Sequence, residues 1–294
     1  MKTRIITAAV GLVLLAIVMT LFNTPVVELV LSLVTLLGLH EIFKAFNLGE
    51  KTTHVYAAFV PYTLLLMFSG YSTVVKALMV PATYLLMLYL ALCLIRRSQT
   101  LDAGKLGGFV MFSAITLVGF YSLVYIKNVL PAAQYGCEAI YIIVMGLVFA
   151  WGGDTFAYFS GYFFGKHKLA PIVSPKKTVE GAIGGVLGSG ILGVLCTMIA
   201  RALTDGLAGA TFGYGTVFLL GMICSVLGIF GDLFASAVKR QCGIKDYGTI
   251  FPGHGGIMDR FDSVLFIMPV VAIAVWLMSG GKDLLFGIMS IAVG

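Results

Sequence analysis

Apolar runs of about 15 to 25 residues recur along the chain, and a run of that length matches the hydrocarbon core of a bilayer crossed by a helix. They limit the fold of the 294 residues more than any other feature. Strands of a membrane barrel would alternate apolar and polar residues, which these runs do not. Charged residues make up 11% of the chain, about half of what covers a water-soluble protein of this size. We therefore expect an all-α, polytopic integral membrane helix bundle.

About nine transmembrane helices fit the hydropathy pattern. The predicted spans lie near residues 5–22, 26–39, 55–69, 74–95, 107–126, 139–163, 181–203, 213–235 and 263–279. The second and third are short enough to be tilted or partly re-entrant. The first has the basic start and apolar middle of a secretory signal, but no convincing cleavage site follows, so we expect a retained helix. A last apolar piece, 284–294, is too short to span alone.

The distribution of basic residues predicts the orientation. With the N-terminus in the cytoplasm, the lysines and arginines that fall in outer segments are Lys76, Lys127, Arg201 and Lys282. All others of the 19 fall in inner segments, as the positive-inside rule requires. We expect a multi-pass protein of the cell inner (plasma) membrane, with a cytoplasmic N-terminus and an active site that faces the cytoplasm.

The charge balance and the cysteines narrow the class of function. The formal net charge is +6, and its place in cytoplasmic loops favours acidic lipids or nucleotides as ligands, with no nucleic acid expected. The five cysteines show no CxxC spacing, so we expect neither a disulfide framework nor a zinc site.

We predict one integral membrane domain in two parts. Residues 1–130 hold N-terminal transmembrane helices, and residues 131–294 hold a catalytic region with long cytoplasmic loops at 164–180 and 236–262.

Carboxylates stand at the ends of the last two predicted spans. Asp232 falls near the cytoplasmic end of the eighth span, and Ser236 lies one helical turn further on. Asp259 and Asp262 are three residues apart, so they share one side of the helix that starts the ninth span. Magnesium prefers oxygen ligands and usually binds through one or two carboxylates plus substrate phosphates. The spacing therefore predicts a divalent-cation site.

The loop between these carboxylates is basic and rich in glycine. Side chains suited to neutralising phosphates are Lys239, Arg240, Lys245 and Arg260. Glycines that let backbone N–H groups approach an anion closely are Gly253, Gly255 and Gly256, within "FPGHGGIMDRFDS". The plainer alternative is that the basic residues only set topology, that the glycines only form a loop, and that His254 is structural. The density of the whole set favours chemistry.

A second constellation begins inside the sixth span. Asp154 lies within it, and a carboxylate in a membrane span is costly, which makes it a functional candidate. The glycines of the segment 181–190 have small-xxx-small spacings, which predict close helix packing and no chemistry.

The stretch "SPKKTVEG" (174–181) follows that span. Thr178 or Ser174 is placed to cap the seventh helix. Lys176 and Lys177 stand at the start of the same helix, where the N–H groups and the two ammonium groups suit an anion. The alternative is a capped helix with a topology-setting lysine pair.

The motifs together resemble a known family. The stretch "SAVKRQCGIKDYGTIFPGHGGIMDRFD" (236–262) is similar to the signature of the phosphatidate cytidylyltransferases, also called CDP-diacylglycerol synthases. The pattern S-x-x-K-R-x(4)-K-D-x-G, P-G-H-G-G and D-R-x-D is met at every specified position. The preceding "GD", the upstream "DTFAYFSGYFFGKHKL" and "SPKKTVEG" also agree, so the resemblance covers about residues 151–263. One departure is Ala235, where many members have Glu.

The resemblance implies an activity and its cofactor. Members join CTP to phosphatidic acid and release pyrophosphate, with Mg²⁺ required. The resemblance then assigns metal binding to Asp232 and Asp259, with Asp262 or Asp246, and leaves Asp154 for a second cation. It assigns phosphate binding to the basic residues of both loops and substrate contacts to Ser236, His254, Thr178 and the three loop glycines. Partners would be CTP, phosphatidic acid and membrane lipids, and members are usually homodimers.

Other functions stay open at this point. A CTP-dependent enzyme acting on another membrane lipid, of the polyprenol kinase or CDP-archaeol synthase type, would share the chemistry and change the acceptor. An ion-coupled secondary transporter would explain Asp154, although its polar residues would more naturally occur in two matching halves. A CDP-alcohol phosphotransferase is set aside, since the sequence has no D-G-x-x-A-R segment.

Overall fold

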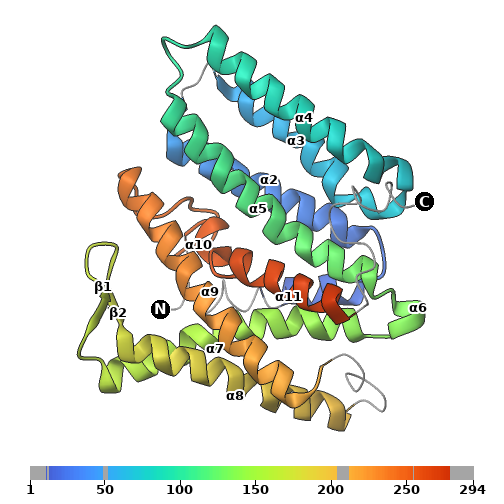
Figure 1. Ribbon diagram of the computed structural model, residues 1–294, viewed down its shortest axis with the longest axis vertical. Helices are drawn as coiled ribbons and strands as arrows, with labels where there is room; N and C mark the ends of the chain where they lie inside the picture. The colour runs from blue at the N-terminus through green and yellow to red at the C-terminus, as the bar shows by residue number, and fades with distance from the viewer. Residues whose placement is uncertain (1–10, 12, 49–51, 204–211, 254, 279–294) are drawn as a thin grey trace. The chain divides into compact units, whose positions relative to one another are not determined.

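The computed structural model describes residue 11 and residues 13–48, 52–203, 212–253 and 255–278 (Figure 1). Most of these residues are helical. The long helices are α2 (Val26–Phe46), α3 (Thr53–Met67), α4 (Thr73–Arg96), α5 (Ala103–Val129), α7 (Glu138–Phe164), α8 (Val179–Leu203), α9 (Tyr214–Gln241) and α11 (Val264–Met278). Shorter elements are η2 (Ser69–Tyr71), α6 (Ala132–Tyr135), α10 (Met258–Phe261), β1 (Lys168–Ala170) and β2 (Ser174–Thr178).

The structure confirms the all-α membrane class. In the described part of the chain, six helices are long and apolar enough to cross a membrane by length and composition: α2, α4, α5, α7, α8 and α9. Helices α3 and α11 coincide with predicted spans but have 15 residues each. Of the first predicted span, residues 13–20 are described and helical. The number nine and the orientation of the N-terminus stay predictions, and the apolar piece 284–294 lies outside the described residues.

The chain divides into two compact units. One holds the described residues of Met1–Tyr125 together with Ile244–Arg260, and the other holds Ile126–Gly243 together with the described residues of Phe261–Lys282. The segment that carries much of the family signature therefore folds with the N-terminal helices. The division into 1–130 and 131–294 stays a sequence-based prediction.

The core of the first unit is aromatic. Phe109 of α5 packs edge-on against Phe43 of α2 and Phe59 of α3, with ring centroids 5.8 and 5.3 Å apart. The segment 244–260 joins the same core, because the ring of Tyr247 lies 5.6 Å from that of Phe112. Aromatic pairs at these distances add to the stability that their burial provides.

The second unit is built on the close pair α7 and α8, which lie side by side (Figure 1). Small residues make this approach possible. A Cβ atom added to Gly185 of α8 would lie 2.9 Å from the carbonyl oxygen of Gly153 and 2.9 Å from Cβ of Ala157, both on α7. The prediction of close packing by the 181–190 glycines is confirmed, and the packing it serves lies within the chain.

A two-stranded hairpin stands where the sequence predicts only a loop, at 164–180. Strands β1 and β2 pair antiparallel, with Lys168 opposite Thr178 and Ala170 opposite Ser174. The hairpin leads directly into α8 (Figure 1). Lys176 and Lys177 therefore lie on β2, before α8 begins at Val179. The prediction that they stand at the start of that helix is wrong.

Candidate functional site

Two constellations that the sequence treats separately meet in the second unit. Lys177, on β2, places its Nζ atom 2.5 Å from Oδ2 of Asp232 on α9. Ser236 donates from Oγ to Oδ1 of the same carboxylate at 3.2 Å, the contact expected one helical turn apart. The side chains of Lys177 and Asp232 are 24% and 30% exposed, so this charged group is partly shielded from water.

Asp262 lies beside this group because α9 and the turn before α11 are in close contact. A Cβ atom added to Gly231 would lie 2.6 Å from the carbonyl oxygen of Asp262. Burial, followed by the negative charge of Asp232, raises the pKa of the Asp262 carboxyl to about 7. The backbone N–H of Ser263, which donates to Oδ1 at 2.8 Å, opposes that rise. The raised pKa therefore reflects first the burial of the Asp262 carboxyl and second its repulsion by the Asp232 carboxylate.

Asp232 and Asp262 supply carboxylate oxygens, the ligand type that a divalent cation such as Mg²⁺ prefers. Within the described residues no group of three or more His, Cys, Asp or Glu side chains is arranged to hold a metal ion. Magnesium needs fewer protein ligands, because one or two carboxylates and substrate phosphates complete its shell. Two repelling carboxylates provide the charge that such an ion neutralises. Asp154 is exposed on α7 and acts electrostatically on Asp262.

In the first unit, Asp259 shapes the loop that precedes it. Its Oδ2 accepts hydrogen bonds from the backbone N–H groups of Tyr247 at 2.8 Å and Gly256 at 3.0 Å. Gly253 and Gly255 have φ values of 77° and 87°, a left-handed backbone that favours glycine. The role of Asp259 as a metal ligand stays a prediction, and so does phosphate binding by Gly256, whose N–H donates to Asp259.

A residue that sequence reasoning does not single out also holds this loop. Glu41 of α2 is 4% exposed and accepts hydrogen bonds from the backbone N–H groups of Ile257 and Met258, each at 3.0 Å. The predicted second span ends at residue 39, whereas α2 continues to Phe46. The sequence feature that could have identified Glu41 is a carboxylate within the mostly apolar stretch "LGLHEIFKAF".

The remaining predicted residues are placed as follows. Thr178 caps α8, since its Oγ1 accepts a hydrogen bond from the N–H of Gly181 at 3.1 Å, which confirms one of the two predicted caps. The exposed residues are Lys176, Arg240, Lys245, Asp246 and Arg260, while Lys239 is half-buried. His254 lies outside the described residues. Ala235 is 1% exposed on α9.

Glu180 fixes the base of the hairpin. It accepts hydrogen bonds from the backbone N–H groups of Lys166 at 3.0 Å and His167 at 3.2 Å, and from the His167 ring at 2.6 Å. An acidic residue in the first turn of α8 also complements the N-terminal end of the helix. Glu180 therefore joins the residues just before β1 to the start of α8, at the end of the hairpin that is next to Lys177.

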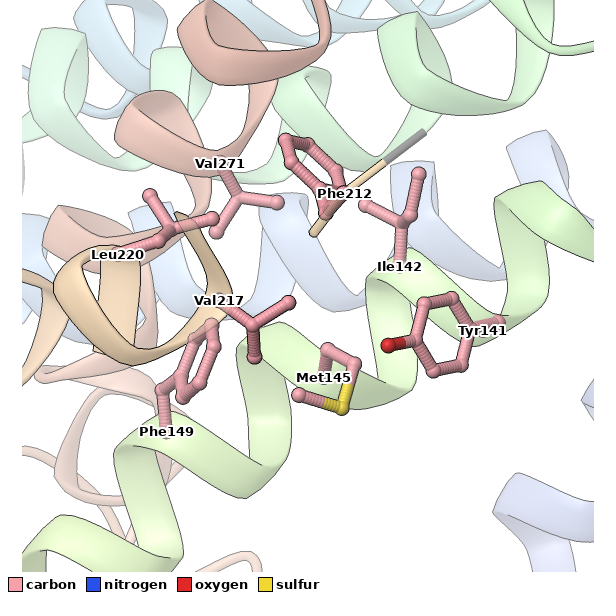
Figure 2. Close-up of a pocket in the computed structure, with 8 residues that line it drawn as sticks. All are labelled: Tyr141, Ile142, Met145, Phe149, Phe212, Val217, Leu220 and Val271. Carbon is pink, nitrogen blue, oxygen red and sulfur yellow. The ribbon is translucent and has the colours of Figure 1, made fainter. Parts of the chain in front are cut away.

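An apolar pocket lies away from the charged group, within the second unit. Figure 2 shows the side chains around it, which are Tyr141, Ile142, Met145, Phe149, Phe212, Val217, Leu220 and Val271. It encloses about 10 Å³, room for about one water molecule. A pocket of this size and lining is a packing defect rather than a site for a nucleotide.

The fold and the charged groups define a class first: a membrane helix bundle whose second unit brings a lysine, a hydroxyl and two carboxyl groups together beside its helix ends. The comparisons give the family. The model of the cytidylyltransferase family matches residues 2–278, and the chain therefore belongs to that family, as its signature predicts.

Curated relatives carry a more specific name. The phosphatidate cytidylyltransferase of Bacillus subtilis (strain 168) is 40% identical over 163 residues, which is 55% of each chain. The protein of the same name from Staphylococcus aureus (strain COL) is 42% identical over 138 residues, 46% of this chain and 49% of the relative. The chain thus spans about half the length of the curated relatives that it matches.

Proposed function

We propose that the protein transfers a cytidylyl group from CTP to phosphatidic acid, giving CDP-diacylglycerol and pyrophosphate for phospholipid synthesis. The observation that carries this proposal is the contact between Lys177, Asp232 and Ser236 with Asp262 beside it. A purely structural protein gives no reason for an ammonium group, a hydroxyl and two carboxyl groups to meet in one place. Membership of the family supports the same chemistry.

The reaction is an in-line displacement at phosphorus. An oxygen of the lipid phosphate forms a bond to the α-phosphorus of CTP, the bond from that phosphorus to the bridging β-phosphate oxygen breaks, and pyrophosphate leaves with the electron pair. The attacking phosphate is already charged, so no strong base is required. Both reactants are polyanions, and the main tasks of the protein are neutralisation and alignment.

Asp232 and Asp262 would hold Mg²⁺ together with substrate phosphates, and the ion when bound would neutralise charge on the triphosphate. Lys177 keeps Asp232 oriented through its ion pair and is within the same charged group to contact a phosphate oxygen. The other basic residues proposed to hold phosphates are Lys176, Lys239, Arg240, Lys245 and Arg260. Asp246, Asp259 and Asp154 stay candidates for the same or a second cation.

The setting of the reaction is part of the proposal. Phosphatidic acid keeps its acyl chains in the bilayer while CTP arrives from water, which accounts for polar chemistry at helix ends. The positive-inside bias supports nine spans, a cytoplasmic N-terminus and an active site open to the cytoplasm of the inner membrane. A homodimer is proposed from the family, while the 181–190 glycines are already engaged within the chain.

The test is an assay of the purified protein in detergent micelles with labelled CTP, phosphatidic acid and Mg²⁺. We expect stoichiometric CDP-diacylglycerol and pyrophosphate from the parent, and a loss of roughly 10²-fold or more from Asp232→Asn, since such groups act on the charge of the transition state. Asp102→Asn is the matched control, because the side chain of Asp102 caps α5 at 2.7 Å and Asn also caps well.

Three outcomes separate the parts of the proposal. Activity in Asp232→Asn equal to that of the control would overturn the role of Asp232 and keep the enzyme. No product from the parent, in conditions where the Bacillus subtilis relative is active, would overturn the acceptor or the reaction. Product formed only when a polyprenol replaces phosphatidic acid would identify the acceptor as another lipid.

A further inference from the structure

Glu41 is a buried carboxylate in a membrane helix, and its partners are backbone groups of a distant loop. Its Oε1 accepts from the N–H of Ile257 and its Oε2 from the N–H of Met258, each at 3.0 Å and across 216 and 217 positions of sequence. Both oxygens are thus directed at consecutive peptide groups just before Asp259. A buried carboxylate is costly unless hydrogen bonds of this kind compensate it.

The loop is shaped around that carboxylate at two further positions. A Cβ atom added to Gly248 or to Gly256 would collide with the carboxylate of Glu41. Gly248 is not among the residues with positive φ, so its backbone does not require glycine. The three heavy atoms nearest to the Cβ atom added at Gly248 all belong to Glu41. Gly248 and Gly256, from two separate parts of the loop, therefore both pack against the Glu41 side chain of α2.

The second support of the loop comes from within it. Oδ2 of Asp259 accepts from the N–H groups of Tyr247 and Gly256. Together the two carboxylates hold four backbone N–H groups, at 247, 256, 257 and 258. One turn earlier on α2, Gly38 makes room for Met258, whose Sδ would lie 3.0 Å from an added Cβ. The face of α2 that bears Gly38 and Glu41 is thus fitted to the segment that carries Asp259 and Arg260.

We propose that Glu41 is a positioning residue for cytidylyl transfer: it fixes the peptides of Ile257 and Met258 and thereby the directions of the Asp259 and Arg260 side chains. This inference rests on the proposed function for its kinetic part only. It gives the N-terminal helices a role in the reaction, because a helix far from the signature in sequence sets the geometry of the signature. A displacement of about 1 Å at a reacting group is enough to cost roughly 10²-fold in rate.

The first test replaces Glu41 by Gln, which keeps the size and one acceptor oxygen but directs an NH₂ group at a backbone N–H. We expect kcat to fall by about 10- to 100-fold, with KM for CTP and phosphatidic acid within about threefold of the parent. Hydrogen–deuterium exchange should rise in the segment 247–260 and stay unchanged in α7 and α8. The matched control is Glu28→Gln, which removes the charge of another buried carboxylate on the same helix.

The second test changes the loop side of the contact and then combines that change with a shorter carboxylate at position 41. Gly248→Ala should displace the carboxylate and lower kcat, and Glu41→Asp, which is shorter by one methylene, should lower it less. The double variant should then be more active than Gly248→Ala alone, because the shorter side chain withdraws from the new Cβ atom. Such rescue is a coupling that two independent structural defects would not give.

The outcomes are distinct from those of the proposed function. Parent kcat in Glu41→Gln, strictly additive losses in the double variant, or equal effects of Glu28→Gln on kcat would each overturn the positioning role. If the parent makes no product but loop exchange still rises in Glu41→Gln, the proposed function fails and the loop contact stands. Unchanged exchange in 247–260 would overturn the contact itself.

Discussion

Lys176 and Lys177 are neighbours on β2, but their surroundings differ. Lys177 is three-quarters buried and pairs with Asp232, whereas Lys176 is exposed. We expect Lys177→Met to lower kcat/KM by roughly 10²-fold, because it removes a fixed charge next to the carboxylate that would bind the metal. Lys176→Met, the adjacent control, should lower it only a few-fold. Steady-state kinetics with both substrates measure this, and equal losses at the two positions would contradict it.

The raised pKa of Asp262 predicts that the thermal stability of the metal-free protein depends on pH. Its pKa is raised in the folded state, to about 7 from the ordinary value of 3.8, so the folded protein binds this proton more tightly than the unfolded chain. The stability it contributes is present at low pH and is lost as the pH rises through about 7. With EDTA present, we expect the melting temperature to fall between pH 5 and pH 8 and to fall less in Asp262→Asn. A parallel fall in both proteins would contradict the assignment.

Some side-chain contacts can be predicted from the sequence and others cannot. The Ser236–Asp232 contact follows from helical spacing, and the Thr178 cap follows from residue type at a helix start. The pairing of Lys177 with Asp232 depends on how β2 meets α9, which spacing along the chain does not encode. Glu41 is harder still to find, because its partners are backbone groups, which every residue has and no sequence pattern marks.

The close contact of α7 with α8 leads to a prediction about stability. Gly185→Ala adds a Cβ atom 2.9 Å from a backbone oxygen of α7, and such overpacking costs about 1–3 kcal/mol. Gly215→Ala on α9 adds a Cβ atom with nothing within 4 Å and should be neutral or slightly stabilising because alanine favours a helix. Thermal unfolding in one detergent compares them. Equal stability of the two variants would show that the helices separate without cost.

Helix positions are the part of the fold that the sequence predicts best. Eight of the predicted spans coincide with described helices because long apolar runs have few other structures open to them. The end of α2 differs, since the predicted span stops at residue 39, whereas the helix continues through Glu41 and Lys44 to Phe46. The hairpin of β1 and β2 was not predicted, because its strands are short and its lysines and prolines are typical of loops.

For the whole molecule, the orientation in the membrane can be tested with two positions. Cys137 is exposed between α6 and α7, on the predicted outer side, and Ile172 is 92% exposed in the hairpin, on the predicted inner side. In intact cells an impermeant maleimide should label Cys137 and leave Ile172→Cys unlabelled in a background without other exposed cysteines. In inverted vesicles the pattern should reverse. Labelling of both from one side would overturn the proposed topology.

The anchoring of residues 244–260 on α2 has a consequence for how the protein is made. Glu41 leaves the ribosome 216 residues before Ile257, a delay of about 10 to 40 s at ordinary rates of synthesis. During that interval α2 reaches the membrane with a carboxylate whose final partners do not yet exist. The nascent chain must keep Glu41 protonated, or in contact with water or a chaperone, until its own later segment arrives. Insertion of α2 and completion of its unit are therefore separate events in the life of the chain.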